Sequence, residues 1–306
     1  NISVAFLFNT FLKNIGASIR FLVFLTIHAI TAFLLFQYSP LKDPFLVITP
    51  YAFLSGAVLT TLFVLLVSQE VIFGILFLTT RPSVSTTSNG KHFIILGAIY
   101  IVNILLLYLR NSGVIRVELA IIDEFWVLII STIIAFFTIK GKNVLFPKYP
   151  FTPYAYLLLS GLGVLAFITL TFQFVITNNP AIDAFKDLIS FVHLGFGFMF
   201  YAYILLNFLA ALYKSVPVYK IVYKEINFPY VTSLLAGLAI FAGLFFYSDK
   251  KPFFEIQGAY FNLHGDTQQA LKDFTLAESY YKGGGLYGGN IQKSYFHLAS
   301  LAKYDV

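Results

Sequence analysis

The chain contains no cysteine and little charge. Without cysteine there is no thiolate nucleophile, no cysteine-ligated zinc or iron–sulfur site and no disulfide. Only 11% of the 306 residues are charged, whereas soluble domains carry about 25%. These two shortages exclude thiol chemistry and a soluble protein built around a single core.

Hydrophobic residues are abundant, at 58% of the chain, with a mean hydropathy of +0.81. Several apolar blocks reach the roughly 20 residues that an α-helix needs to cross a hydrocarbon core of about 30 Å. The composition therefore predicts an all-α, polytopic helical membrane protein that contacts the lipid bilayer. We expect an interfacial helix over 1–16 and a transmembrane domain over 17–248. Seven spans are predicted within that domain, at about 18–38, 51–79, 93–110, 125–139, 154–177, 188–213 and 229–248.

Basic residues are distributed unequally between the loops on the two predicted sides. One side contains ten of them: Lys13, Arg20, Arg81, Lys91, Lys140, Lys142, Lys148, Lys214, Lys220 and Lys224. The other side's connecting loops contain four, which are Lys42, Arg110, Arg116 and Lys186. Loops rich in lysine and arginine remain cytoplasmic, so the sequence predicts a multi-pass protein of the cytoplasmic (inner) membrane. Its N-terminus is inside, and its C-terminal segment is outside, or periplasmic. The basic residues behind the net charge of +6 are expected to set the orientation in the membrane and to contact anionic lipid headgroups. We therefore expect no nucleic-acid partner.

Four polar side chains fall inside the predicted spans: His28, Glu70, Asn103 and His193. Polar groups at membrane depth are rare and are functional candidates by default. The alternative to a functional role is a structural one, hydrogen bonding between helices, and the sequence favours it for the histidines and for Asn103. Haem ligation by the two histidines is disfavoured, because their predicted depths differ by several ångström.

Glu70 has two interpretations. In one tilted helix over 51–79 it lies within the bilayer, where a carboxylate is able to carry protons or bind a cation. If the span instead ends near Ser68, Glu70 lies in the inner headgroup layer. The sequence favours this second interpretation.

Ser160 beside Gly161, followed by His193 on the next span, weakly resembles the serine–histidine pattern of rhomboid intramembrane proteases. Leu158 stands where that family has glycine. Small residues such as Ser160 and Gly161 more often form a close-packing helix face, and we favour that interpretation. We expect no catalytic residue, no metal and no cofactor.

The composition changes abruptly at residue 249. The segment 249–306 carries equal numbers of basic and acidic residues, with apolar positions at helical spacing. Bulky, small and aromatic residues recur in it at steps of three and four, at Phe254, Gly258, Phe261, Gly265, Ala270, Phe274 and Ala277. This pattern resembles a tetratricopeptide repeat (TPR) or the related Sel1-like repeat, with departures at Gln257 and Lys282. The resemblance implies a helical hairpin that turns at Gly265-Asp266, with Ala270, Phe274 and Ala277 in its second helix.

A glycine-rich loop, KGGGLYGGN, is expected to separate this hairpin from a second unit containing Tyr295, Leu298, Ala299 and Ala302. One and a half repeats do not bury a solenoid core, which needs about three, so we expect more repeats after Val306. Repeats of this kind bind proteins. The resemblance therefore implies a partner-binding role for the aromatic residues Phe254, Phe261, Phe274 and Tyr295.

The sequence thus predicts a non-enzymatic membrane scaffold or assembly subunit of the cell envelope. It would bind other membrane or periplasmic proteins through its C-terminal repeat. Two alternatives stay open. One is a transporter or proton-coupled protein that uses Glu70. The other is an envelope glycan or lipid transferase, for which the suggestive residues are Arg110, Arg116 and Glu118 in one outer loop.

Overall fold

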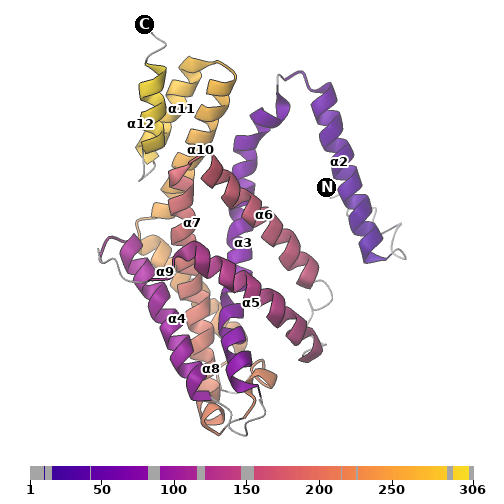
Figure 1. The fold of residues 1–306 in the computed structure, drawn as a ribbon, viewed down its shortest axis with the longest axis vertical. Helices are drawn as coiled ribbons and strands as arrows, with labels where there is room; N and C mark the ends of the chain where they lie inside the picture. The colour runs from indigo at the N-terminus through magenta and orange to yellow at the C-terminus, as the bar shows by residue number, and fades with distance from the viewer. Residues whose placement is uncertain are drawn as a thin grey trace. The chain divides into compact units, whose positions relative to one another are not determined.

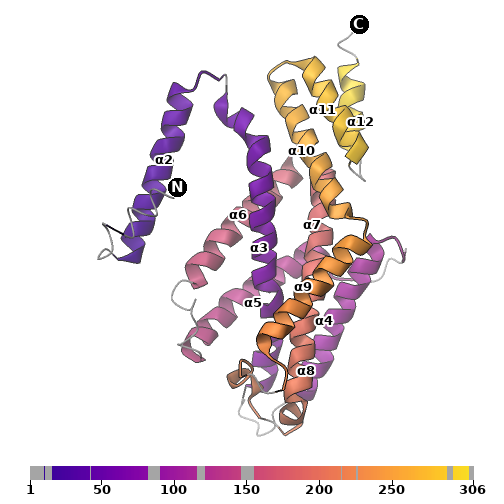
Figure 2. The ribbon, with the colours of Figure 1, turned by 180° about the vertical axis from the view of Figure 1, so that it is seen from behind.

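A computed structural model describes residues 10, 16–41, 43–81, 90–115, 121–145, 155–214, 216–224, 227–287 and 292–302. Over these ranges the protein is all-helical, without a β-strand (Figures 1 and 2). The chain divides into two compact units, residues 1–52 and residues 53–306. The interfacial helix predicted over 1–16 lies outside the described residues, apart from positions 10 and 16.

The first unit contains α2 (Ala17–Tyr38) and the beginning of α3 (Pro44–Thr80). Phe36 and Phe45 stack across the turn between the two helices, with ring centroids 5.4 Å apart. The hydroxyls of Thr26 and Thr31 donate to backbone carbonyls one turn earlier. This is how a hydroxyl is satisfied in an apolar helix that offers no other partner.

The second unit contains the rest of α3 and all later helices. These are α4 (Gly90–Asn111), α5 (Glu124–Leu145), α6 (Ala155–Val175), α7 (Asn179–Val192), a π-helix (His193–Gly197), α8 (Phe198–Tyr213), a 3-10 turn (Val218–Lys220), α9 (Tyr230–Tyr247), α10 (Lys251–Ala270), α11 (Phe274–Tyr287) and α12 (Gln292–Leu301).

Five helical stretches are long and apolar enough to cross a membrane. They are Pro44–Thr80, Gly90–Asn111, Ala155–Val175, Asn179–Tyr213 and Tyr230–Tyr247. The spans predicted at 18–38 and 125–139 fall on α2 and α5, whose apolar parts, Leu22–Tyr38 and Glu124–Ile139, are shorter. The predicted all-helical class is therefore confirmed over the described residues, and five helices could span a membrane, whereas the seven spans stay a prediction.

The second unit is organised around α7. From Asp187 to His193 every side chain is buried, and α4, α5, α6, α9 and α10 all pack against this helix. Together with the π-helix and α8 it forms a stretch of 35 residues. At 1.5 Å per residue this stretch is about 52 Å long, well beyond a hydrocarbon core of about 30 Å. A helix of this length is able both to cross a membrane and to extend past it.

The C-terminal helices pack directly on this extended helix. In both views α10, α11 and α12 lie side by side, with α10 against the beginning of α7 (Figures 1 and 2). Ala259 and Leu263 of α10 belong to the same hydrophobic cluster as Phe185 and Leu188 of α7. The C-terminal segment therefore shares a continuous core with the apolar helices and belongs to the same compact unit.

The hairpin itself differs from the sequence prediction in its turn. The predicted turn at Gly265-Asp266 is wrong, because α10 continues through both residues to Ala270. The chain reverses at 271–273 instead, where Lys272 has a φ of +64°. Ala270 consequently ends the first helix and does not belong to the second. Gly265 serves close packing: a Cβ there would lie 2.6 Å from the Tyr281 ring of α11.

The predicted glycine-rich loop is also partly helical. The stretch from Lys282 to Tyr287 belongs to α11, and residues 288–291 lie outside the described part of the chain. Gly283 and Gly284 bring α11 close to α10, since a Cβ at Gly283 would lie 3.2 Å from the Phe261 ring. A Cβ at Gly284 would lie 2.4 Å from the Asn262 side chain. Glycine has a low intrinsic helix propensity. These close contacts explain why it nevertheless stands at these two positions of α11.

Candidate functional site: the junction of the apolar helices and the C-terminal helices

Two of the four polar candidates in the predicted spans make structural contacts. His28 Nδ1 lies 2.8 Å from the Phe24 carbonyl within α2. Asn103 clamps the peptide at Ile122: its amide donates to the Ile122 carbonyl at 3.1 Å and its oxygen accepts from the Ile122 N–H at 2.9 Å. Asn103 thus fixes the segment before α5 on α4, and both side chains have a partner within hydrogen-bonding distance.

Glu70 forms an ion pair with another apolar helix. Its Oε1 lies 2.6 Å from the Lys142 ammonium, and its Oε2 accepts from the Thr138 hydroxyl at 2.5 Å, both on α5. The helix itself does not end near Ser68, because α3 continues unbroken to Thr80, and the depth of Glu70 in the bilayer stays a prediction. Lys142 also lies 4.4 Å from the Phe73 ring centroid, in the geometry of a cation–π contact. The carboxylate therefore already has a counter-ion.

His193 begins the π-helix that interrupts the long α7–α8 stretch. Its Nδ1 lies 2.5 Å from the Tyr100 hydroxyl of α4, and the side chain is fully buried. The π-helix brings Gly195 against α9, where a Cβ would lie 2.7 Å from the Gly237 carbonyl. A single wide turn of this kind moves the following residues around the helix. Here it accommodates a backbone contact and a histidine–tyrosine pair.

The four aromatic residues assigned to partner binding fall into two groups. Phe261 packs inside the hairpin, stacked on Tyr287 with ring centroids 5.6 Å apart. Phe254 and Phe274 are 40% and 37% exposed, and Tyr295 is 58% exposed. Beside Tyr295 on α12, Phe296 is 72% exposed. The most exposed aromatic side chains of helices α10–α12 are therefore Tyr295 and Phe296 on α12.

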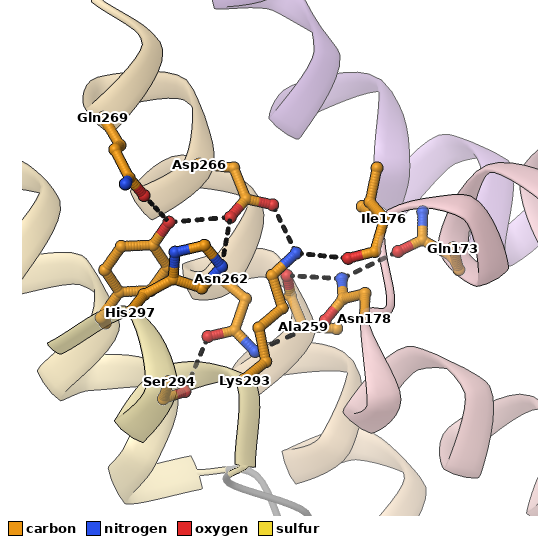
Figure 3. A network of polar contacts seen from close by, with 11 residues as sticks. Gln173, Ile176, Asn178, Ala259, Asn262, Asp266, Gln269, Lys293, Ser294 and His297 are labelled. Carbon is orange, nitrogen blue, oxygen red and sulfur yellow. Dashed lines mark hydrogen bonds and ion pairs between the residues drawn. The ribbon is translucent and has the colours of Figure 1, made fainter. Parts of the chain in front are cut away.

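A buried polar network joins α12 and α10 to the end of α6 (Figure 3). At its centre is Lys293 of α12, whose side chain is 5% exposed. Its ammonium lies 2.6 Å from Asp266 Oδ2 of α10 and donates to the Ile176 carbonyl at 2.7 Å. One cation thus ties the last described helix both to the hairpin and to the segment that connects α6 with α7.

Asp266 is held by a third element as well. The Tyr281 hydroxyl of α11 lies 2.8 Å from Asp266 Oδ1 and 2.9 Å from Gln269 Oε1. The His297 ring stacks on the Tyr281 ring at 4.7 Å between centroids. Burial lowers the pKa of His297, so this imidazole is neutral at pH 7. Lys293 is therefore the cation that compensates Asp266.

A chain of amides extends the same network toward α7. Asn178, just before α7, donates to Gln173 Oε1 at 2.8 Å and to the Ala259 carbonyl at 3.1 Å. Asn262 of α10 donates to Asn178 Oδ1 at 3.4 Å and accepts from the Ser294 hydroxyl at 2.8 Å (Figure 3). Thr177, directly before Asn178, has a φ of +51°, which turns the backbone at this point.

A second polar cluster lies where α4, α5, α7 and α10 meet. Arg110 lies 3.0 Å from Glu124 Oε2, and the Asn111 side chain donates to Glu124 Oε1 at 2.8 Å. Lys251, the first residue of α10, lies 2.9 Å from Asp187 Oδ2 and 3.5 Å from Glu255 Oε1.

Sequence reasoning did not identify most of the junction. Asp266 was assigned to a turn, Lys293 and Ser294 carried no assignment, and Asn178 is one of many polar loop residues. One signal was present: Lys293 lies three residues before Phe296 and four before His297, so a lysine shares a helix face with ring residues. Among the described residues no group of three or more histidine, aspartate or glutamate side chains is arranged to hold a metal ion.

Comparisons with known proteins found no match to this chain, among protein-family models, curated proteins or solved structures.

Proposed function

We propose that this protein is a non-enzymatic membrane scaffold or assembly subunit. In this proposal the C-terminal helices form a TPR-like platform outside the cytoplasmic membrane that binds other membrane or periplasmic proteins. The observation that carries the proposal is the junction network, which fixes α10–α12 on the α6–α7 connection through Lys293, Asp266 and Asn178. A binding surface held in this way loses little conformational entropy when a partner docks.

The exposed side chains of α12 support the same proposal. Tyr295 and Phe296 are 58% and 72% exposed, although Lys293 and Ser294 of the same helix are buried. Large exposed aromatic side chains are the residues that most often dominate protein–protein binding energy. We place the partner-binding surface there.

The topology belongs to the proposal too. The five long apolar helices, together with α2 and α5, would give seven spans, and the excess of basic residues in alternate loops supports an inside N-terminus.

We expect a single cysteine at Glu278 of α11 to react with a membrane-impermeant maleimide from outside intact cells. A cysteine at Lys220, in a loop predicted inside, would react only after permeabilisation. The natural chain lacks cysteine, so the background is low. If Lys220→Cys were labelled in intact cells and Glu278→Cys were protected, the orientation would be the opposite of the one proposed.

The binding surface is tested by a paired substitution. We expect Tyr295→Ala/Phe296→Ala to reduce the amount of co-purified partner at least about tenfold, because aromatic hot-spot residues contribute about 2 kcal/mol or more each. The control is Lys272→Ala/Lys282→Ala, two exposed residues of the same hairpin region, which should leave co-purification unchanged. Quantitative mass spectrometry after gentle detergent extraction provides the measurement. A protein that runs as a lone monomer, or a partner retained equally by both variants, would contradict the proposal.

The transport alternative draws less support from the geometry. Glu70 has Lys142 and Thr138 within hydrogen-bonding distance, so a transported cation would have to displace an ammonium. The transferase alternative relied on Arg110, Arg116 and Glu118. Arg110 is engaged with Glu124, and the other two residues lie outside the described part of the chain.

A further inference from the structure

The contact between α7 and α10 contains a mismatch of charge. Asp187 and Glu255 are 3% and 2% exposed, and the ion pairs that both form within the described residues are with the single ammonium of Lys251. Glu255 Oε2 is buried without a hydrogen-bond partner. Two buried carboxylates therefore share one cation, and one negative charge lacks compensation.

Among the residues that the structure describes, the surrounding elements do not supply the missing cation. On α7, Asp183 adds a further negative charge near Glu255. From α4, the Asn111 carbonyl lies 3.5 Å from Lys251 Nζ and so adds another oxygen. Arg110 is engaged with Glu124 at 3.0 Å and with Asp123 at 3.7 Å. The nearest charged groups are thus mostly acidic or already paired.

We infer that Asp187 and Glu255 form a proton-binding site, and that one bound proton holds α10 against α7. A proton on Glu255 removes the uncompensated charge without any change of backbone. The site lies at a helix contact on which the position of the whole C-terminal segment depends. This inference does not depend on the proposed scaffold function, because docking of α10 on α7 is measured in the isolated protein.

The direction of the pH effect follows from the titration of Glu255. Its pKa is raised from an ordinary value of 4.5 to about 8, mainly by burial; Lys251 opposes this rise and the carboxylates of Asp187 and Asp183 add to it. Burial also lowers the pKa of Lys251, but Asp187 and Glu255 outweigh this effect and hold that pKa above its ordinary value. Lys251 therefore stays charged throughout the window in which Glu255 titrates.

Docked Glu255 binds its proton more tightly than undocked Glu255. The stabilisation of the docked state is complete below pH 4.5, decreases as the pH rises from 4.5 to about 8, and is absent above about 8. Within this window the ratio of docked to undocked protein falls by about tenfold per pH unit. Alkaline conditions therefore favour release of α10 from α7.

Thiol trapping measures this ratio even when the undocked state is rare. Ala259 is fully buried in the α7–α10 contact, so an Ala259→Cys side chain reacts with a maleimide only after α10 separates from α7. Its rate is divided by that of Glu278→Cys, an accessible position on α11, to remove the pH dependence of thiol chemistry. We expect the normalised rate to rise about fiftyfold between about pH 6 and pH 8 and then to level off.

Glu255→Gln keeps the shape of the protonated side chain and removes its titration, so the normalised rate in this variant should be independent of pH. Glu278→Gln, tested in the Ala259→Cys background with the same reference rate, removes an exposed carboxylate and should titrate like the parent protein. The proton itself is detected as a carboxyl C=O band in the infrared difference spectrum across this pH range, and the band should vanish in Glu255→Gln. A rate independent of pH in the parent protein, an equal rise in Glu255→Gln, or a difference spectrum unaffected by that substitution would each overturn the inference.

Discussion

Replacement of Lys142 by methionine is expected to lower the free energy of unfolding by about 3–5 kcal/mol, the cost of breaking a buried ion pair from one side. Lys142 and Glu70 have side chains that are 18% and 12% exposed, and their charged atoms are 2.6 Å apart. Methionine keeps about the length of the side chain but loses the cation–π contact with the Phe73 ring. What it removes is the counter-ion, so the Glu70 carboxylate is left between apolar helices with the Thr138 hydroxyl as a hydrogen-bond donor.

The double variant Glu70→Gln/Lys142→Met separates charge from packing. With both charges removed, the free energy of unfolding should return to within about 1–2 kcal/mol of that of the parent protein, because an ion pair replaced by neutral groups is often nearly neutral in stability. Denaturant titration in detergent micelles measures the free energy of unfolding of the parent protein, of each single variant and of the double variant, which together form a double-mutant cycle. Additive losses in the double variant would show that the two side chains stabilise the protein independently and that the pair is not the important feature.

The second large effect is expected for Lys293→Met. The Lys293 side chain is 5% exposed and neutralises Asp266, which is 27% exposed. Loss of the ammonium leaves the Ile176 carbonyl without this donor and Asp266 without its closest cation, although the Tyr281 hydroxyl still lies 2.8 Å from the carboxylate. Because Asp266 is partly hydrated, the expected loss is below that of a fully buried pair, at about 2–3 kcal/mol. The same denaturant titration measures it.

Lys282→Met is the matched control on the neighbouring helix. Lys282 also lies 2.6 Å from a carboxylate, that of Glu278, but its side chain is 65% exposed. Exposed pairs at this helical spacing contribute about 0.3–0.5 kcal/mol, so the control should be close to the parent protein. Equal losses in the two variants would mean that the network in Figure 3 does not fix α12 to the rest of the molecule.

The junction thus contains two kinds of polar contact. Around Lys293 the donors and acceptors are matched, with one ammonium facing one carboxylate. Around Lys251 two carboxylates share one ammonium, and the contact is expected to weaken as the pH rises toward about 8. A platform held by both would remain attached through α12 while α10 responds to protonation.

Sequence reasoning failed in the C-terminal segment at the level of single residues. Gly265-Asp266 matches a turn dipeptide, and the sequence offers no sign that the glycine faces the Tyr281 ring or that the aspartate meets Lys293. Glycine favours a turn by local conformation and permits a helix contact by its missing side chain. Only the arrangement of α10 and α11 decides between these roles.

Polar residues in the apolar helices show the same limit. Their rarity identified Glu70, Asn103 and His193 from composition alone, because polar groups in long apolar stretches are unusual. Their partners Lys142, Ile122 and Tyr100 are 72, 19 and 93 residues away in the chain. No local pattern relates positions so far apart, so pairing was beyond the reach of sequence reasoning.

What the sequence by itself determined is the class of protein and the place where its character changes. Long apolar blocks and scarce charge allow only helices that satisfy their own backbone in lipid, and the sudden rise in polarity at residue 249 marks the C-terminal helices. The tertiary structure decided that these helices are packed on α7 as part of one compact unit, and which buried charges meet there. Helix formation depends on neighbours in the chain, whereas packing between helices depends on residues that only the fold brings together.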